Sequence, residues 1–158
     1  MSTTRRIGGL VGFVLLVALV SLLGQLATSP AIDGWYAGLV KPSWTPPNWV
    51  FAPIWTLLYL MIAIGGWRIW LHQGHACRAA ALRAFGIQLG LNLAWSLIFF
   101  GMRAPWAGML IMALLIIAII WQIRTALRLE QLAAWLFVPY LLWVIYAATL
   151  NGGIIALN

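Results

Sequence analysis

Aromatic rings at helical spacing are the side chains of this sequence that could bind a ligand. Phe51, Trp55 and Tyr59 recur every four residues in an apolar run, so in a helix their rings lie on one face. Such a row could form the wall of a site for a flat, apolar molecule. Membrane tryptophans commonly anchor a helix at the interface or pack against other helices, and the spacing alone leaves both interpretations open.

The stretch before these rings is rich in proline. Pro42, Pro46 and Pro47 fix φ and keep each preceding residue out of the α region, which predicts an extended, stiff segment from Lys41 to Asn48 and a helix that begins at about Trp49. The whole loop, residues 29–48, is 20 residues long. That is too long for an idle connection between membrane helices, so we expect it to have a functional role.

Two other apolar runs carry amide and ring side chains on one helical face. Gln88, Asn92 and Trp95 are four and three residues apart, and Trp143 and Ala147 are four apart, which places each group on one side of its helix. Asn92 could contact a ligand or form an interhelical hydrogen bond, as is common between membrane helices. Ala147 leaves space beside the Trp143 ring, which is what a planar ligand needs.

The composition identifies the class of protein. Of 158 residues, 65% are apolar and 7% are charged, which excludes a soluble domain of this size and indicates an integral membrane protein. We therefore predict a single all-α domain, residues 1–158, that forms a bundle of five transmembrane helices. The first apolar run is too long for a signal peptide and is counted as a helix, and Pro139 is expected inside the last helix, where neighbouring helices tolerate it. The expected spans are residues 7–27, 49–70, 79–100, 106–127 and 133–151.

Basic residues indicate the orientation of the chain. On one side of the five predicted spans only Lys41 and Arg103 are basic. The positive-inside rule then predicts a cytoplasmic N-terminus, with the first loop and the C-terminus on the opposite side, periplasmic in a bacterium. The basic residues lie at span ends and form no stripe, so no nucleic-acid partner is expected. The basic residues on the other side are Arg5, Arg6, Arg68, Arg78, Arg83, Arg124 and Arg128.

Few side chains could support metal or acid–base chemistry. His72 and His75 are three residues apart, but no cluster of carboxylates or thiolates accompanies them and Cys77 is the only thiol, so no metal site is expected. The two acids, Asp33 and Glu130, fall in predicted loops, which argues against an ion-coupled carrier. No nucleophile, base and orienting acid converge as hydrolysis requires.

A pair of small residues suggests how the helices could assemble. Gly86 and Gly90 form a Gly-x-x-x-Gly pattern in the third predicted span. Such a pair lets two helix backbones approach closely. We therefore expect it to mark the contact face of a homodimer.

Several motifs occur in a characteristic order along the chain. Trp35-Tyr36 precedes the proline-rich motif Lys41-Pro42-Ser43-Trp44-Thr45-Pro46-Pro47-x-Trp49-Val50-Phe51. Gln88-Leu89-x-Leu91-Asn92-x-x-Trp95 and Val138-Pro139-Tyr140-x-x-Trp143 follow in the third and fifth spans. Together they resemble the TspO/translocator protein family, also called tryptophan-rich sensory or peripheral benzodiazepine receptor proteins.

The resemblance implies a bundle, often dimeric, that binds porphyrins such as protoporphyrin IX and haem in a pocket beneath the first loop, with a role in tetrapyrrole transport or sensing. It implies no cofactor apart from porphyrin or haem as the ligand. Light-dependent porphyrin degradation by pocket tryptophans is an enzymatic alternative. The chain departs from the family's cholesterol motif, because no Lys or Arg follows Tyr146. By position, the implied ligand-binding residues are Trp44, Phe51, Trp55, Asn92, Trp95, Trp143 and Ala147.

Overall fold

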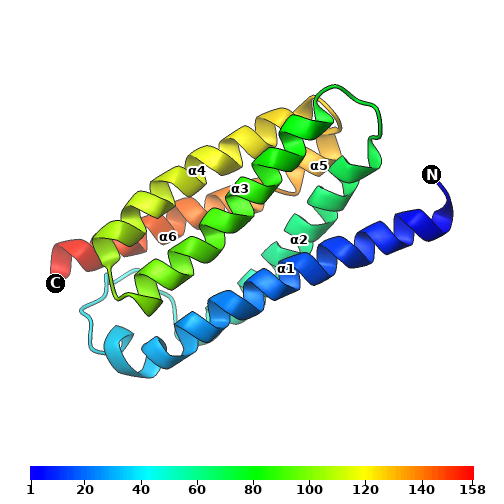
Figure 1. Cartoon of the computed structure of the whole chain (residues 1–158). Coiled ribbons are helices and arrows are strands. Elements are labelled where there is room, and N and C mark those ends of the chain that lie inside the picture. Colours follow the sequence, from blue (N-terminus) through cyan, green and yellow to red (C-terminus); the bar gives the residue numbers. More distant parts are fainter.

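Five long apolar helices make up most of the structure. The computed structural model describes residues 1–158, and five of its helical segments are long and apolar enough to cross a membrane. The predicted all-α, five-span architecture is therefore confirmed. Figure 1 shows α2, α3, α4 and α6 side by side in a bundle, with α1 along its outside. The helices are α1 (Thr3–Ala31), α2 (Phe51–Leu71), α3 (Arg78–Ser96), α4 (Pro105–Leu127), α5 (Gln131–Trp135) and α6 (Val138–Leu157), with a 3₁₀ turn at Asn48–Val50 and π-helical turns at Ile32–Tyr36 and Leu97–Gly101.

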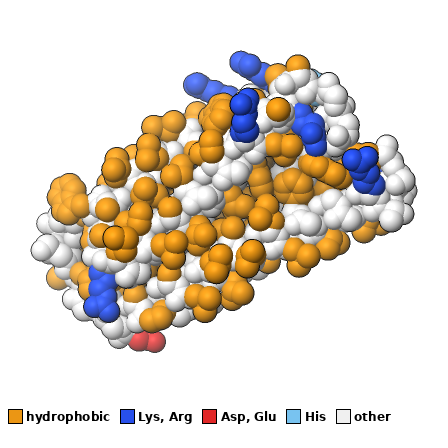
Figure 2. Space-filling view, viewed as in Figure 1, with side chains coloured by type: hydrophobic (Ala, Val, Ile, Leu, Met, Phe, Trp, Pro, Cys, Tyr) orange, Lys and Arg blue, Asp and Glu red, His pale blue; other side chains and the backbone are white.

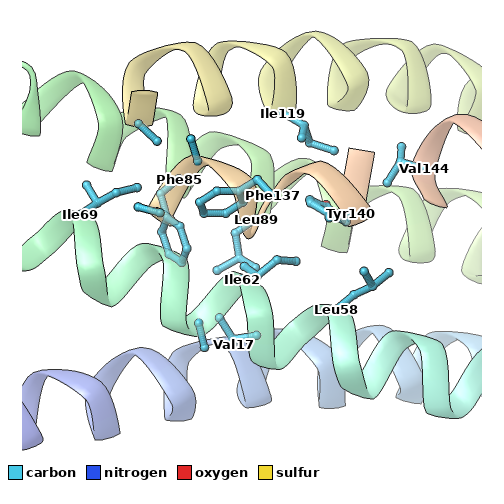
Figure 3. Packing of buried hydrophobic residues seen from close by; sticks show 14 of the residues in the cluster. Val17, Leu58, Ile62, Ile69, Phe85, Leu89, Ile119, Phe137, Tyr140 and Val144 are labelled. Atoms are coloured by element: carbon cyan, nitrogen blue, oxygen red, sulfur yellow. The ribbon is translucent and has the colours of Figure 1, made fainter. Parts of the chain in front are cut away.

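The core is formed by apolar side chains that all the long helices contribute (Figure 3). Gly65 and Gly66 of α2 let large rings approach the backbone: a Cβ on Gly65 would lie 2.7 Å from the Phe137 ring, and one on Gly66 would meet the rings of Phe13 and Phe85. At this level of the bundle, aromatic rings therefore pack directly against the glycine backbone of α2. Its labelled members in Figure 3 are Val17, Leu58, Ile62, Ile69, Phe85, Leu89, Ile119, Phe137, Tyr140 and Val144.

The outer surface is apolar over most of its length. Figure 2 shows hydrophobic side chains across the visible face of the bundle, with most of the visible Lys and Arg side chains at one end. Trp49 and Trp106, at the opposite end, are 74% and 76% exposed. Exposed tryptophans near helix ends are typical of residues at the membrane–water interface, so the surface agrees with a bilayer environment.

The first loop is shorter than predicted. The expectation of a loop over residues 29–48 is wrong for its first part, because α1 continues to Ala31 and a π-helical turn follows to Tyr36. Pro30 has no N–H, but the N–H of Ile32 still bonds Thr28 O, so the helix persists. The buried Tyr36 ring then packs against Phe99 and Phe100 of the next π-helical turn.

The proline-rich segment is also not uniformly extended. The N–H of Thr45 donates to Pro42 O at 3.0 Å, which makes a turn centred on Ser43 and Trp44. Prolines fix φ at their own positions and disfavour the α region only at the residue before them. Ser43 and Trp44 lie between two such sites and are free to turn.

The last predicted span is divided in two. Residues 131–135 form the short helix α5, and Val138 begins a new helix that runs to Leu157. Pro139 therefore lies in the first turn of α6, where its missing N–H would have no helical partner, and the expectation that it lies inside the helix is wrong. The helix also runs past residue 151, the predicted end of the span, to Leu157, and the other predicted bounds differ from the observed ones by a few residues.

Candidate ligand-binding site

A cavity of about 350 Å³ lies at the end of the bundle that carries the first loop. Small-molecule sites have volumes from roughly 300 Å³ upward, so the cavity is large enough to be one. The aromatic residues of its lining come from α2, α3, α6 and the two π-helical turns. They are Tyr36, Phe51, Trp55, Tyr59, Trp95, Phe99, Phe100 and Trp143.

These rings contact one another in three groups, and all three groups line the cavity. The ring centroids of Phe51 and Trp143 lie 5.7 Å apart with an edge-on geometry, and those of Trp55 and Tyr59 lie 5.2 Å apart. Trp95 stacks on Phe99 at 5.1 Å and 19°. Each pair is within the range at which aromatic rings stabilise one another, so the rings within each group support one another's positions on the cavity wall.

The predicted ring face of the second span is confirmed. Phe51, Trp55 and Tyr59 all line the cavity, so this row faces the interior of the bundle. Trp143 and Ala147 of α6 line the cavity as well, in agreement with the predicted shared face. The structure thus brings rings from α2 and α6 together around one space.

Asn92 does not line the cavity. It is 3% exposed, and its Oδ1 accepts a hydrogen bond of 2.8 Å from the Tyr59 hydroxyl, while its Nδ2 donates to the Tyr140 hydroxyl at 3.1 Å. Tyr59 does line the cavity. The amide therefore lies one residue behind the wall and joins α2, α3 and α6, which is the interhelical role considered for it from the sequence.

Trp44 also lies outside the lining. Its side chain is 54% exposed, its Nε1 donates to Thr149 Oγ1 at 3.3 Å, and its carbonyl accepts a bond of 2.7 Å from the Tyr146 hydroxyl. These bonds attach the loop to α6. The structure therefore places Trp44 in the loop above the site and not on the cavity wall.

Sequence reasoning missed the wall that α1 provides. The polar lining residues of α1 are Ser21, Gln25, Thr28 and Ser29. They recur at helical spacing along an otherwise apolar helix, and polar groups inside a span are a signal of function that could have revealed them. Asn151 of α6 was also missed; its Oδ1 accepts from Trp95 Nε1 at 3.3 Å and its Nδ2 donates to Pro105 O at 2.9 Å.

The remaining candidate residues lie away from the cavity. His72 Nδ1 is 2.9 Å from Arg68 O, and His75 Nδ1 accepts from the Cys77 N–H at 3.2 Å, so both imidazoles contact backbone atoms in the connection between α2 and α3. Gly86 and Gly90 are exposed on α3, and a Cβ on either would have no neighbour within 4 Å. That face of α3 is open in a single chain.

Comparison with known proteins identifies the family. The profile of the TspO/MBR family matches residues 13–157. The chain belongs to the TspO/MBR family. It is 40% identical over 149 residues to the tryptophan-rich protein TspO of Archaeoglobus fulgidus (94% of this chain and 96% of that protein). It is 39% identical over 152 residues to the translocator protein of Sus scrofa (89% and 85%) and 34% identical over 152 residues to the tryptophan-rich sensory protein of Cereibacter sphaeroides (92% of each chain).

Membership of the TspO/MBR family and the five apolar helices together make this chain an integral membrane protein. The match covers nearly the whole length of the chain and of these relatives. The bundle, the loop and the cavity therefore all fall within the part of the sequence that the family shares.

Proposed function

We propose that this protein is a membrane receptor or carrier that binds porphyrin-type ligands, such as protoporphyrin IX or haem, in the aromatic cavity beneath the first loop. The observation that carries the proposal is the set of eight aromatic rings from α2, α3, α6 and the two π-helical turns that line one cavity. Flat apolar molecules are stabilised by such walls through stacking and burial of apolar surface. Membership of the TspO/MBR family and names of relatives that refer to translocation and sensing support the same role.

The chemistry of the lining favours binding over catalysis by the side chains. No Asp, Glu, His, Lys, Arg or Cys lines the cavity. General acid–base catalysis usually uses these residue types, and the hydroxyls of the lining serines and threonines would need such a group beside them to become nucleophiles. A tetrapyrrole in this cavity would therefore be held by ring contacts and by neutral hydroxyl and amide groups.

A fluorescence titration tests the proposal. Adding protoporphyrin IX to the purified protein should quench tryptophan fluorescence, and Trp143→Leu should weaken binding about five- to hundred-fold, because stacking on an aromatic ring contributes about 1–3 kcal/mol. The Nε1 of Trp143 has no hydrogen-bond partner, so the substitution removes a ring and no bond.

Trp106→Leu is the matched control for this titration. Trp106 is 76% exposed on α4 and lies outside the cavity lining, so its loss should leave the affinity unchanged. If the two variants bind protoporphyrin IX with equal affinity, the cavity is not the binding site. The absence of binding to the unsubstituted protein would overturn the proposed function.

Two further features belong to the proposed function. We propose that the protein works as a homodimer through the open face of α3 around Gly86 and Gly90. We also propose that the basic end of the bundle faces the cytoplasm, which places the loop and the cavity at the opposite surface of the membrane.

A further inference from the structure

The cavity is open at the side of the bundle. The lining residues that are exposed to the exterior all come from the second half of α1, the 3₁₀ turn before α2 or the first turns of α2, whereas the lining residues from α3 and α6 are buried or half-buried. The opening therefore lies between α1 and α2. Apart from Ala52, its exposed residues are polar, and we call them the polar gap: Gln25, Ser29, Asn48 and Thr56.

The packing of α1 explains why this gap exists. In its first half α1 packs on α2, where the Trp70 ring lies on Gly9 and the Phe13 ring lies on Gly66. In its second half α1 packs on α3, where a Cβ on Gly24 would lie 3.3 Å from Ser96 Oγ. The helix thus crosses the outside of the bundle (Figure 1), and Ala52 and Thr56 near the start of α2 stay exposed.

The polar gap offers neutral hydrogen-bonding groups. The side chains of Gln25, Ser29 and Asn48 make no hydrogen bond within the chain, and Thr56 Oγ1 donates only to Ala52 O, at 2.8 Å. Amides and hydroxyls of this kind can donate to a carboxylate or accept from an acid or alcohol. The aromatic rings of the lining are all buried or half-buried, so the site has an exposed polar edge and an apolar interior.

No charged side chain lines the cavity that could pair with a ligand carboxylate. The cation of the first loop is engaged elsewhere: Lys41 Nζ lies 3.3 Å from both Ala37 O and Leu39 O, and 4.8 Å from the centroid of the Tyr36 ring. Burying a carboxylate without a partner is strongly unfavourable. The acidic groups of a bound ligand must therefore stay where water or lipid headgroups can reach them.

We infer that the polar gap holds the carboxylate edge of the ligand, while the uncharged body of a planar molecule lies inside against the aromatic wall. This inference rests on the proposed function and extends it by naming the orientation of the ligand and the residues that hold its polar end. The ligand class is a flat, apolar ring system with acidic groups along one edge.

A cation introduced at the gap tests the orientation. Gln25→Lys should tighten binding of protoporphyrin IX by about fivefold or more, because an ion pair forms at the gap, and should leave binding of its uncharged dimethyl ester unchanged. Ser29→Lys, one turn along α1, should act in the same way and serves as the second variant if Gln25→Lys does not fold. The readout is the quenching titration with each of the two ligands.

Leu26→Lys is the matched control. Leu26 neighbours Gln25 but is 64% exposed and lies outside the cavity lining, so a cation there should change neither affinity. Three results would overturn the inference and leave the proposed function standing. They are an equal gain for Gln25→Lys and Leu26→Lys, an equal gain for the dimethyl ester, and no gain for protoporphyrin IX with either Gln25→Lys or Ser29→Lys. If neither ligand binds the unsubstituted protein, the proposed function fails and the inference fails with it.

Discussion

Asn92 links Tyr59 of the cavity lining to the packing of three helices. Its amide bonds the hydroxyls of Tyr59 on α2 and Tyr140 on α6, and Tyr140 is fully buried. Polar groups in an apolar interior are costly unless each has a partner. The three side chains satisfy one another, and they hold Tyr59 in its place on the cavity wall.

Replacing Asn92 should therefore weaken the fold more than it weakens ligand contacts. Asn92→Leu removes both interhelical hydrogen bonds, and we expect it to lower the stability of the detergent-solubilised protein by about 1–2 kcal/mol. Thermal unfolding measures the effect. Thr125→Val is the control, because Thr125 Oγ1 bonds only Trp121 O and Gln122 O of its own helix. If porphyrin affinity falls as far as in Trp143→Leu while the stability is unchanged, the role of Asn92 lies in ligand binding and not in the fold.

The sequence predicted the rings of the site better than its polar residues. Phe51 and Trp55 stand at helical spacing in one span, and Trp143 and Ala147 do so in another, so each pattern placed its ring on one helical face. Trp44 could not be separated from them, because the bonds that attach it to α6 reach Thr149 and Tyr146, about 100 positions along the chain. Such long-range contacts depend on how the helices pack, and local spacing contains no information about them.

At the scale of elements, the first loop is fastened to the end of α6. The Pro42 ring packs on Gly153, and the side chain of Asn158 bonds both the N–H and the carbonyl of Val40, each at 3.0 Å. The loop thus lies over the end of the bundle next to the cavity. Loops that cover a site commonly control access to it.

A side chain at Gly153 should loosen this attachment. A Cβ there would overlap the rigid Pro42 ring, so Gly153→Ala should displace the loop and speed amide hydrogen exchange in residues 37–47. Gly152→Ala is the control, because its Cβ would meet only the flexible end of Met109, at 3.1 Å. Identical exchange in the two variants would mean that Pro42 does not fasten the loop.

The exposed face of α3 is the element to test for assembly. Gly86→Leu or Gly90→Leu adds bulk where a single chain has open space, so neither should disturb the fold, whereas both should separate two helices that meet at this face. We expect these variants to shift the solubilised protein from dimer to monomer in size measurements and cross-linking. Gly12→Leu, on an equally open part of α1, should leave the dimer intact. A dimer that survives both α3 substitutions must use another face.

At the scale of the whole molecule, the arrangement of the spans was predictable and several helix ends were not. Long apolar runs and the charge between them determine how many helices cross the membrane. The continuation of α1 through Tyr36 depends on ring contacts with Phe99 and Phe100, which lie about 60 residues away. The break before Val138 was missed because Pro139 was expected inside a continuous helix, whereas it lies in the first turn of a new one.

The two ends of the bundle differ in charge. The start of α1, the end of α2, the start of α3 and the end of α4 with the residue that follows it carry seven arginines, and Arg68 forms an ion pair with Glu130 there. The end with the first loop carries Lys41 and Arg103 as its basic residues. This asymmetry is the basis for placing the arginine-rich end in the cytoplasm.

The single cysteine of the chain provides a direct test of that orientation. Cys77 lies in the connection between α2 and α3, at the arginine-rich end, and is partly exposed. In intact bacterial spheroplasts a membrane-impermeant maleimide should therefore not label it, whereas labelling should appear once the membrane is permeabilised. The variant Cys77→Ser/Ser43→Cys moves the thiol to the exposed first loop and should be labelled without permeabilisation. The reverse pattern would place the loop and the cavity on the cytoplasmic side, and a ligand would then reach the site from inside the cell.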